Sequence, residues 1–198
     1  MLNNLNFNRQ NKEYKNVFSL WKMLYFWNSP DFSDYLEDNF SILFDMNVLF
    51  EEFIVEFIRK NKRKIKKDIL KVNSQVSNKY VFKDNKFNLK PDIILDFYDE
   101  QKLIIDTKYK KLDKNKTYNG VSSQDIYQMF MYGMRYFDNF EEKNIVLLYP
   151  NYDWKDYKTI YLSNENINIY IKTINLNSDL SSVEWKKKLI REIKNILI

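Results

Sequence analysis

The sequence predicts a mixed α/β fold in which a β-sheet is flanked by helices. Segments whose apolar residues recur at helical spacing alternate with short runs rich in β-branched and aromatic residues, in the order helix, strands, helix, strands, helix. The chain has 198 residues, of which 44% are hydrophobic, so it can bury one substantial core. We therefore expect one domain, with residues 1–40 as a helical extension and residues 41–198 as the core.

Four segments have the apolar periodicity of amphipathic helices: 12–27, 47–60, 122–137 and 183–197. The second follows Asp45 and Asn47, either of which can cap its amino terminus. Its expected core side consists of Leu49, Phe50, Phe53 and Phe57. It runs into the basic stretch 60–67, which we interpret as a solvated helix end rather than as a phosphate-contacting patch.

The third helix begins with a capping-box pattern made by Ser122 and Asp125. Capping accounts for Asp125 without any further role. The stripe expected to face the core consists of Ile126, Met129, Phe130, Gly133 and Phe137.

The predicted strands are short runs separated by polar turns: 80–83, 91–98, 102–109, 144–150, 157–163 and 167–176. Residues 41–46 form a short strand or an extended entry to the second helix. The polar turn 99–101 joins the runs 91–98 and 102–109, so these two strands are expected to pair as a hairpin.

Composition excludes several classes of site. The chain has no cysteine and no histidine, which excludes disulfides, thiolate metal sites and every catalytic centre that needs an imidazole. Its two glycines, Gly120 and Gly133, cannot form a phosphate-binding loop of the Gly-rich type. No apolar stretch suits a membrane span or secretory signal, so we expect a cytoplasmic protein. The formal charge of +5 favours a polyanionic partner.

The strongest chemical signal is a set of charged residues in the predicted hairpin. Asp106 and Lys108 are two residues apart in a strand, so both side chains point to the same face. If the turn is centred so that paired residue numbers sum to about 200, Asp92 lies opposite Lys108 and diagonal to Asp106. Pro91 suits the start of its strand, ahead of Asp92.

Two carboxylates buried together are costly unless a cation compensates them. Their oxygen atoms suit Mg²⁺, which polarises a phosphate and activates a bound water, while Lys108 can orient that water and stabilise negative charge. In the alternative interpretation, Asp92 and Asp106 lie in solvent at strand ends and Lys108 is a surface partner. The spacing of the whole string, which matches hairpin geometry, favours the catalytic interpretation.

At these residues the chain resembles the PD-(D/E)xK nuclease superfamily. The segments LFDMNVLFEEFI (43–54), LKPDIIL, IIDTKYK and SSQDIYQMFMYG are similar to the McrC-like nuclease subunits of McrBC-type modification-dependent restriction systems, over about residues 40–150. The resemblance implies a restriction-endonuclease-like core. It also implies that Lys108 is the catalytic lysine and that Mg²⁺, or Mn²⁺ in its place, is bound by Asp92, Asp106, Glu51 and the backbone carbonyl of Thr107.

The resemblance leaves one ligand open and suggests two further site residues. Glu52 is adjacent to Glu51 and could replace it as the helix-borne acid. Gln128 and Tyr132 resemble the Q-x-x-x-Y element of RecB-like nucleases, which implies a positioning role near the site. An ordinary amphipathic flank would also place a glutamine and a tyrosine there.

The implied function is Mg²⁺-dependent endonuclease cleavage of double-stranded DNA within an McrBC-like 5-methylcytosine-specific system. The implied partner is an McrB-like GTP-hydrolysing AAA+ motor, to which recognition of methylcytosine would belong. From the resemblance we expect that the amino-terminal portion that engages the motor in that family is missing from these 198 residues, so we expect the resemblance to cover only the cleavage module. The alternatives are a RecB-like exonuclease acting without a motor and a non-catalytic nucleic-acid-binding module.

Overall fold

The computed structural model describes residues 45–137, 142–151, 159–176 and 184–197. The chain separates into two units, with the boundary after Phe44. The unit described here begins at Asp45. The helix expected at 12–27 lies outside the described residues, and the domain boundary expected at residue 41 stays a prediction. No helix in the described segments is long and apolar enough to cross a membrane.

A six-stranded mixed sheet forms the centre of this unit. In spatial order its strands are β1 Ile69–Ser74, β4 Ile93–Phe97, β5 Lys102–Thr107, β6 Lys143–Pro150, β8 Ile167–Ile174 and β7 Thr159–Leu162. β4 is antiparallel to β1 and β5, whereas β5, β6 and β8 are parallel, and β7 is antiparallel to β8. A separate pair consists of β2 Lys79–Tyr80 and β3 Asn88–Leu89.

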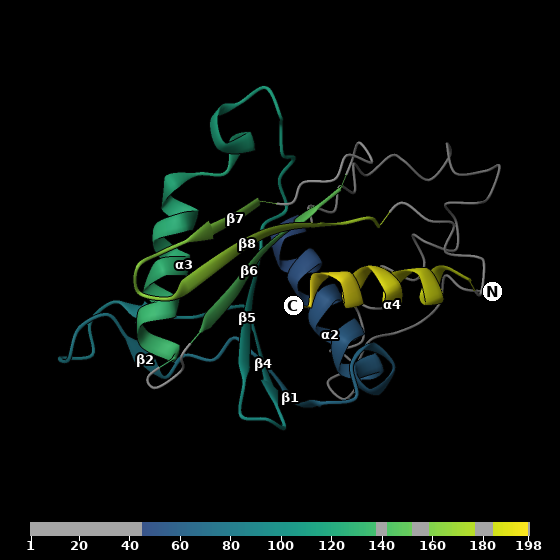
Figure 1. Ribbon diagram of the computed structural model, residues 1–198, viewed down its shortest axis with the longest axis horizontal. Coiled ribbons are helices and arrows are strands. Elements are labelled where there is room, and N and C mark those ends of the chain that lie inside the picture. The colour runs from purple at the N-terminus through teal and green to yellow at the C-terminus, as the bar shows by residue number, and fades with distance from the viewer. Residues whose placement is uncertain (1–44, 138–141, 152–158, 177–183, 198) are drawn as a thin grey trace, which may run out of the picture. The chain divides into compact units, whose positions relative to one another are not determined.

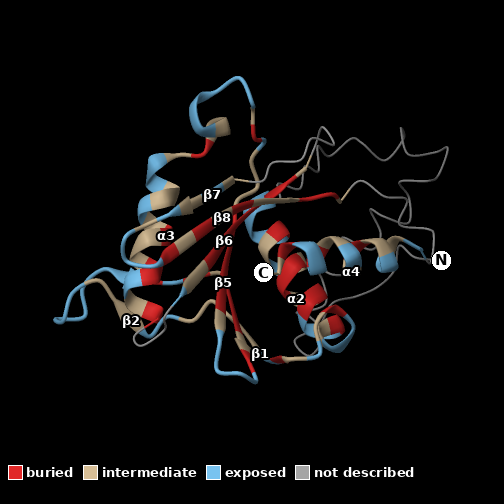
Figure 2. Cartoon of the chain, in the orientation of Figure 1, coloured by how far each residue is buried: buried red, intermediate tan, exposed pale blue. Residues whose placement is uncertain are grey.

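Helices cover both faces of the sheet, which confirms the predicted fold class. The helices α2 Met46–Ile65 and α4 Glu184–Ile196 pack on one face, and α3 Ser123–Tyr136 packs on the other (Figure 1). Alternate residues of the central strands face the two cores: Ile105 belongs to the α2 side and Ile104 to the α3 side. The central strands β5 and β6 are accordingly buried along most of their length, whereas β8 alternates between buried and half-buried residues (Figure 2).

The second predicted helix is confirmed as α2. Asp45 caps it, since its side chain accepts hydrogen bonds from the backbone amides of Asn47 and Val48. The extended entry expected at 41–46 is wrong at Met46, which is already helical, and residues 41–44 lie outside the described residues. The helix continues to the buried Ile65, so most of the basic stretch belongs to its last turns.

The core side of α2 differs from the prediction at Leu49. The buried stripe of this helix consists of Phe50, Ile54, Val55, Phe57, Ile58, Asn61 and Ile65. Phe53 is partly buried against the same core, but Leu49 is 47% exposed. Leu49 lies outside the stripe because the helix presents residues 50, 54, 57 and 58 to the sheet.

The third predicted helix is confirmed as α3, capped by Ser122, whose hydroxyl accepts from the backbone amide of Asp125 at 3.1 Å. Of the predicted stripe, Met129, Gly133 and Phe137 are buried, while Ile126 and Phe130 are partly buried.

Strand β1 was not predicted from the sequence. It lies at one edge of the sheet, and its sequence ILKVNS is half polar, so it lacks the apolar run of a central strand. The strand predicted at 80–83 is shorter than expected, because β2 ends at Tyr80. The remaining predicted strands and the last helix are present as β4 to β8 and α4.

We predict that Gly133→Ala destabilises the fold. A Cβ atom at Gly133 would lie 2.8 Å from side-chain atoms of Ile167, which is fully buried in β8. Overpacking of this kind lowers the free energy of unfolding by about 1 to 3 kcal/mol, whereas Gly→Ala inside an unhindered helix raises it by about 1 kcal/mol. Urea unfolding should therefore show a loss for Gly133→Ala and little change for Met134→Ala, its exposed neighbour. Stabilisation by Gly133→Ala would contradict the close approach.

Candidate active site

The hairpin of β4 and β5 brings the two predicted acids together. Ile93 pairs with Ile105 and Ile94 with Ile104, so paired residue numbers sum to 198. One step further along this register, Asp92 is level with Asp106. The expected sum of about 200, which put Asp92 opposite Lys108, is therefore wrong.

The turn geometry explains the difference. The backbone amide of Phe97 donates to the carbonyl of Gln101, and Glu100 has a left-handed backbone with φ of 64°, which closes the hairpin one residue earlier than expected. The shift moves the cross-strand partner of Asp92 by two positions, from Lys108 to Asp106. Side chains along a strand alternate between the two faces with a period of two. The acids and the lysine therefore remain on one side of the hairpin.

Each of the two acids is held differently. Asp92 Oδ2 accepts from the Thr107 backbone amide at 2.7 Å and from the Thr107 hydroxyl at 2.8 Å. Asp106 is only 1% exposed, and its Oδ2 forms an ion pair with Lys108 Nζ at 2.7 Å. The predicted proximity of Asp106 and Lys108 is confirmed, as is the convergence of both acids on one patch.

Asp106 is an incompletely satisfied buried acid. Its Oδ1 has no hydrogen-bond donor among the described residues. Burial, reinforced by the nearby charge of Asp92, raises the pKa of Asp106 to about 7, although Lys108 acts in the opposite direction. Burial also raises the pKa of Asp92 against the hydrogen bonds from Thr107. The pair is thus poorly neutralised by protein groups.

Lys108 stays a cation in this environment. Burial by itself lowers the pKa of Lys108, but the carboxylates of Asp106 and Asp92 outweigh it and raise the pKa above its ordinary value. The side chain of Lys108 is 25% exposed. It can therefore reach a group outside the protein while it remains paired with Asp106.

The predicted helix pair lies next to this lysine. Lys108 Nζ donates to Gln128 Oε1 at 3.2 Å, and Gln128 Nε2 donates to the Tyr132 hydroxyl at 2.7 Å. The Tyr132 hydroxyl in turn donates to the carbonyl of Lys90 at 3.0 Å. A continuous path of hydrogen bonds therefore leads from Lys108 to the backbone just before Pro91 and Asp92.

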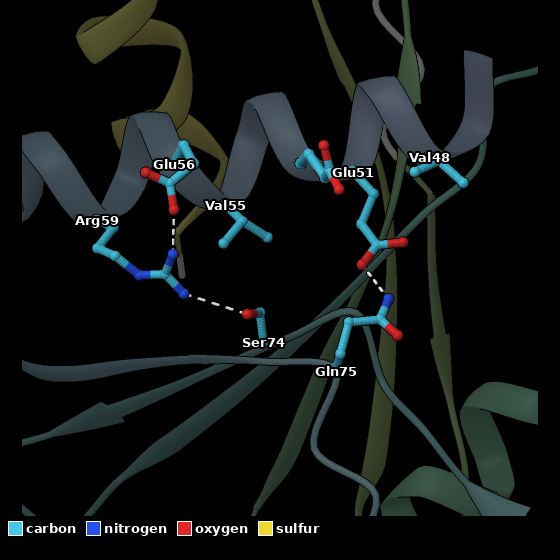
Figure 3. Close-up of a pocket in the computed structure, with 8 residues that line it drawn as sticks. Val48, Glu51, Val55, Glu56, Arg59, Ser74 and Gln75 are labelled. Atoms are coloured by element: carbon cyan, nitrogen blue, oxygen red, sulfur yellow. Dashed lines mark hydrogen bonds and ion pairs between the residues drawn. The ribbon is translucent and has the colours of Figure 1, made fainter. Parts of the chain in front are cut away.

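Glu51 approaches the site from α2 through a residue that sequence reasoning missed. The side chains of Glu51 and Gln75 point toward each other and form a hydrogen bond at the edge of a pocket of about 500 Å³ (Figure 3). The backbone amide of Gln75 donates to the Asp92 carbonyl at 3.1 Å. Burial raises the pKa of Glu51, and the charge of Asp92 adds to the increase. Glu51 is half-buried, whereas Glu52 is exposed, which favours Glu51 of the two acids left open.

Gln75 had no signal in the sequence that could have identified it. It follows β1 with a left-handed backbone, φ 54°, which is uncommon for a residue other than glycine and is enriched at functional sites. Its bond partner Glu51 is 24 residues away in the chain. Only the tertiary structure brings them together.

Asp125 does more than donate its backbone amide to the capping residue Ser122. Its Oδ2 forms an ion pair with Lys110 Nζ at 2.5 Å and accepts from the Tyr149 hydroxyl at 3.4 Å. Burial raises the pKa of this carboxyl, but the bonds from Lys110 and Ser122 outweigh it and lower the pKa below its ordinary value. The interpretation that capping alone accounts for Asp125 is therefore incomplete. In the sequence, Asp106, Lys108 and Lys110 alternate at intervals of two residues. This spacing could have indicated that a second lysine, Lys110, lies on the same side as Lys108.

The residues present fit a hard divalent cation. No group of three or more acids in the described segments is gathered closely enough to form a metal site by itself. Two carboxylates are sufficient for Mg²⁺, which completes its shell with water and carbonyl oxygens. The free Oδ1 atom of Asp106 and the carboxylate of Asp92 supply that donor chemistry. Glu51 and the Thr107 carbonyl stay predictions as ligands.

Comparison with known proteins decides the family. A family model described as McrBC 5-methylcytosine restriction system component matches residues 1–150. The chain belongs to this family. The resemblance to McrBC-type restriction systems noted in the sequence is thereby confirmed. A search of curated proteins finds no match.

A solved structure shares the fold of this McrBC-family chain. It is a chain of the refined half-complex from the tetradecameric assembly of Thermococcus gammatolerans McrB AAA+ hexamers with bound McrC. The likeness covers 99% of the present chain, with a TM-score of 0.60 and 18% sequence identity. It covers 41% of the other chain, so the present chain spans about two fifths of that protein's length.

We predict that Asp106 makes stability depend on pH in the metal-free McrBC-family chain. Its pKa is about 7 in the folded state and 3.8 ordinarily, so the folded acid pair holds a proton that the unfolded chain has released. Stability should therefore fall as pH rises from about 4 to about 7. The variant Asp106→Asn lacks the titrating carboxyl group and should not lose stability in this way. At pH 8 its free energy of unfolding should exceed that of the parent by on the order of 2 kcal/mol or more.

Urea unfolding in EDTA at several pH values measures this effect. Glu165→Gln, on the exposed turn between β7 and β8, also removes one carboxyl group and is the matched control. The same stability difference at pH 4 and pH 8 for Asp106→Asn would refute the assignment.

Proposed function

We propose that the chain is the Mg²⁺-dependent endonuclease module of an McrBC-like 5-methylcytosine-specific restriction system, which hydrolyses phosphodiester bonds of double-stranded DNA. The observation that carries the proposal is the buried Asp106 carboxylate, whose Oδ1 lacks a donor among the described residues, beside Asp92 and Lys108. A structural ion pair would not need a second, unneutralised acid in the same place.

Asp92 and Asp106 would hold the cation, with Glu51 and the carbonyl of Thr107 as further oxygen donors. Mn²⁺ could replace Mg²⁺, because both accept this donor set. The bound cation supplies Lewis-acid polarisation of the phosphate and a lower pKa for a coordinated water. Thr107 fixes the Asp92 carboxylate through two hydrogen bonds, so that one oxygen keeps a constant orientation.

Lys108 provides the remaining charge. As a cation on a partly exposed side chain beside Asp106, it can orient the attacking water and stabilise negative charge as it develops on the phosphate. Gln128 accepts a hydrogen bond from Lys108 and is itself held by Tyr132, which limits the positions that the ammonium group can adopt. Gln75 holds Glu51 in a similar way and connects it to the backbone of Asp92.

The proposed partners follow from charge and from the structural relative. The net charge of +5 favours association with DNA. The relative comes from an assembly of McrB AAA+ hexamers with bound McrC, and we propose that an McrB-like GTP-hydrolysing motor recruits the present chain. Recognition of methylcytosine would then belong to the partner and cleavage to this module.

A RecB-like exonuclease acting without a motor is the second candidate. The hydrogen-bonded pair of Gln128 and Tyr132 beside Lys108 supports it, since this is the element in which the chain resembles RecB-like nucleases. Covalently closed plasmid distinguishes the two, because an endonuclease cuts it and an exonuclease needs an end. A non-catalytic binding module is disfavoured, because clustered acids repel the phosphate backbone.

We predict that Asp106→Ala and Lys108→Ala each reduce plasmid cleavage at least about 100-fold, because each removes a group that acts on the reacting phosphate or its cation. The assay uses supercoiled plasmid with Mg²⁺ or Mn²⁺, with and without an McrB-like partner and GTP. Glu165→Ala and Lys187→Ala, both exposed and more than 35 residues along the chain from Asp92, Asp106, Lys108 and Gln128, are the matched controls and should cleave normally. Cleavage that survives both site substitutions would refute this active site.

A further inference from the structure

A small apolar pocket lies outside the residues used so far. Three tyrosines, Tyr118, Tyr127 and Tyr161, surround a hollow of about 270 Å³ whose other walls are Val121, Ser123 and Ile126. Tyr118 is 65% exposed and Tyr127 is 70% exposed. Large aromatic side chains gathered at an exposed hollow are typical of binding surfaces. We call this hollow the tyrosine pocket.

The loop that presents Tyr118 is tightly constrained. It is anchored by the buried side chains of Leu112 and Val121 and closed by a hydrogen bond from the Asp113 amide to the Asn119 carbonyl at 2.9 Å. Tyr118 and Asn119 both have left-handed backbones, with φ of 52° and 57°. Two such residues in succession cost free energy that the packing of the loop must offset. This constrained backbone keeps the ring of Tyr118 exposed to solvent.

The same loop is basic. It carries Lys111, Lys114 and Lys116, all on the exposed side of the chain, and Asp113 is its acid. Figure 1 shows the loop projecting beyond the amino-terminal end of α3. Lysines interleaved with exposed aromatic rings are the combination by which proteins hold single-stranded nucleic acid, with the cations on phosphates and the rings on bases.

Two connections link the tyrosine pocket to the active site. Tyr127 of the pocket precedes Gln128 in α3, so one helix contributes to both. The loop also follows directly after Lys108, which comes just after the end of β5, and the ion pair between Lys110 and Asp125 fixes the start of the loop against the same helix. A DNA strand with one phosphate at Lys108 would therefore pass beside this loop.

We propose that the tyrosine pocket binds one nucleobase that is unpaired because the two DNA strands are locally separated, with the base stacked on the tyrosine rings while the loop lysines hold the adjoining phosphates. This inference rests on the proposed action on DNA. The pocket is smaller than those that enclose drug-sized ligands and is mainly apolar, which suits a single planar base. An apolar side chain of a partner protein is the competing occupant, and the loop lysines argue against it.

Fluorescence anisotropy of the 198-residue chain with a labelled 12-nucleotide oligothymidylate, in EDTA, tests the proposal without any cleavage. Tyr118→Ala and Tyr127→Ala should each raise Kd roughly tenfold, because stacking of one base is lost. Tyr118→Phe keeps the ring and should stay within about twofold of the parent. A 2-aminopurine in the strand should be quenched by the parent and less by Tyr118→Ala.

Tyr98→Ala is the matched control, since Tyr98 is 68% exposed at the end of β4 and should leave Kd unchanged. Equal Kd values for the parent and both alanine variants would overturn the proposal. The outcome is independent of catalysis. Weaker strand binding by Tyr118→Ala in a chain that cuts no DNA would retain the tyrosine pocket and reject the nuclease.

Discussion

Burial of the Asp92 and Asp106 carboxylates together is the constraint on which the site depends. One lysine faces two acids, so the protein leaves negative charge in a place where water cannot solvate it. Thr107 stabilises one acid and Lys108 the other, yet Oδ1 of Asp106 has no donor among the described residues. A protein retains such an arrangement at a functional site, where an ion or substrate completes it.

The fold places three supports around that pair. The hairpin of β4 and β5 supplies the acids and the lysine at adjoining strand ends. From one face of the sheet α2 contributes Glu51, and from the other α3 contributes Gln128. Because both helices pack on the sheet through extensive apolar stripes, the polar groups at its edge are positioned by the core and not by flexible loops.

The parts predictable from sequence were those that depend on local periodicity. Alternation with a period of two placed Asp106 and Lys108 on one face, and capping residues located the starts of α2 and α3. The hairpin register depended on the backbone of Glu100, a non-glycine residue with positive φ that sequence reasoning does not foresee. Gln75 and the ion pair of Asp125 required knowledge of contacts between distant segments.

The most direct test of the account is anomalous diffraction from crystals grown with Mn²⁺. We expect a single strong peak in contact with the carboxylates of Asp92 and Asp106, with Lys108 turned toward the adjoining solvent or phosphate. Crystals in which Mn²⁺ occupies no position at these acids, while Lys108 keeps its ion pair with Asp106, would contradict it.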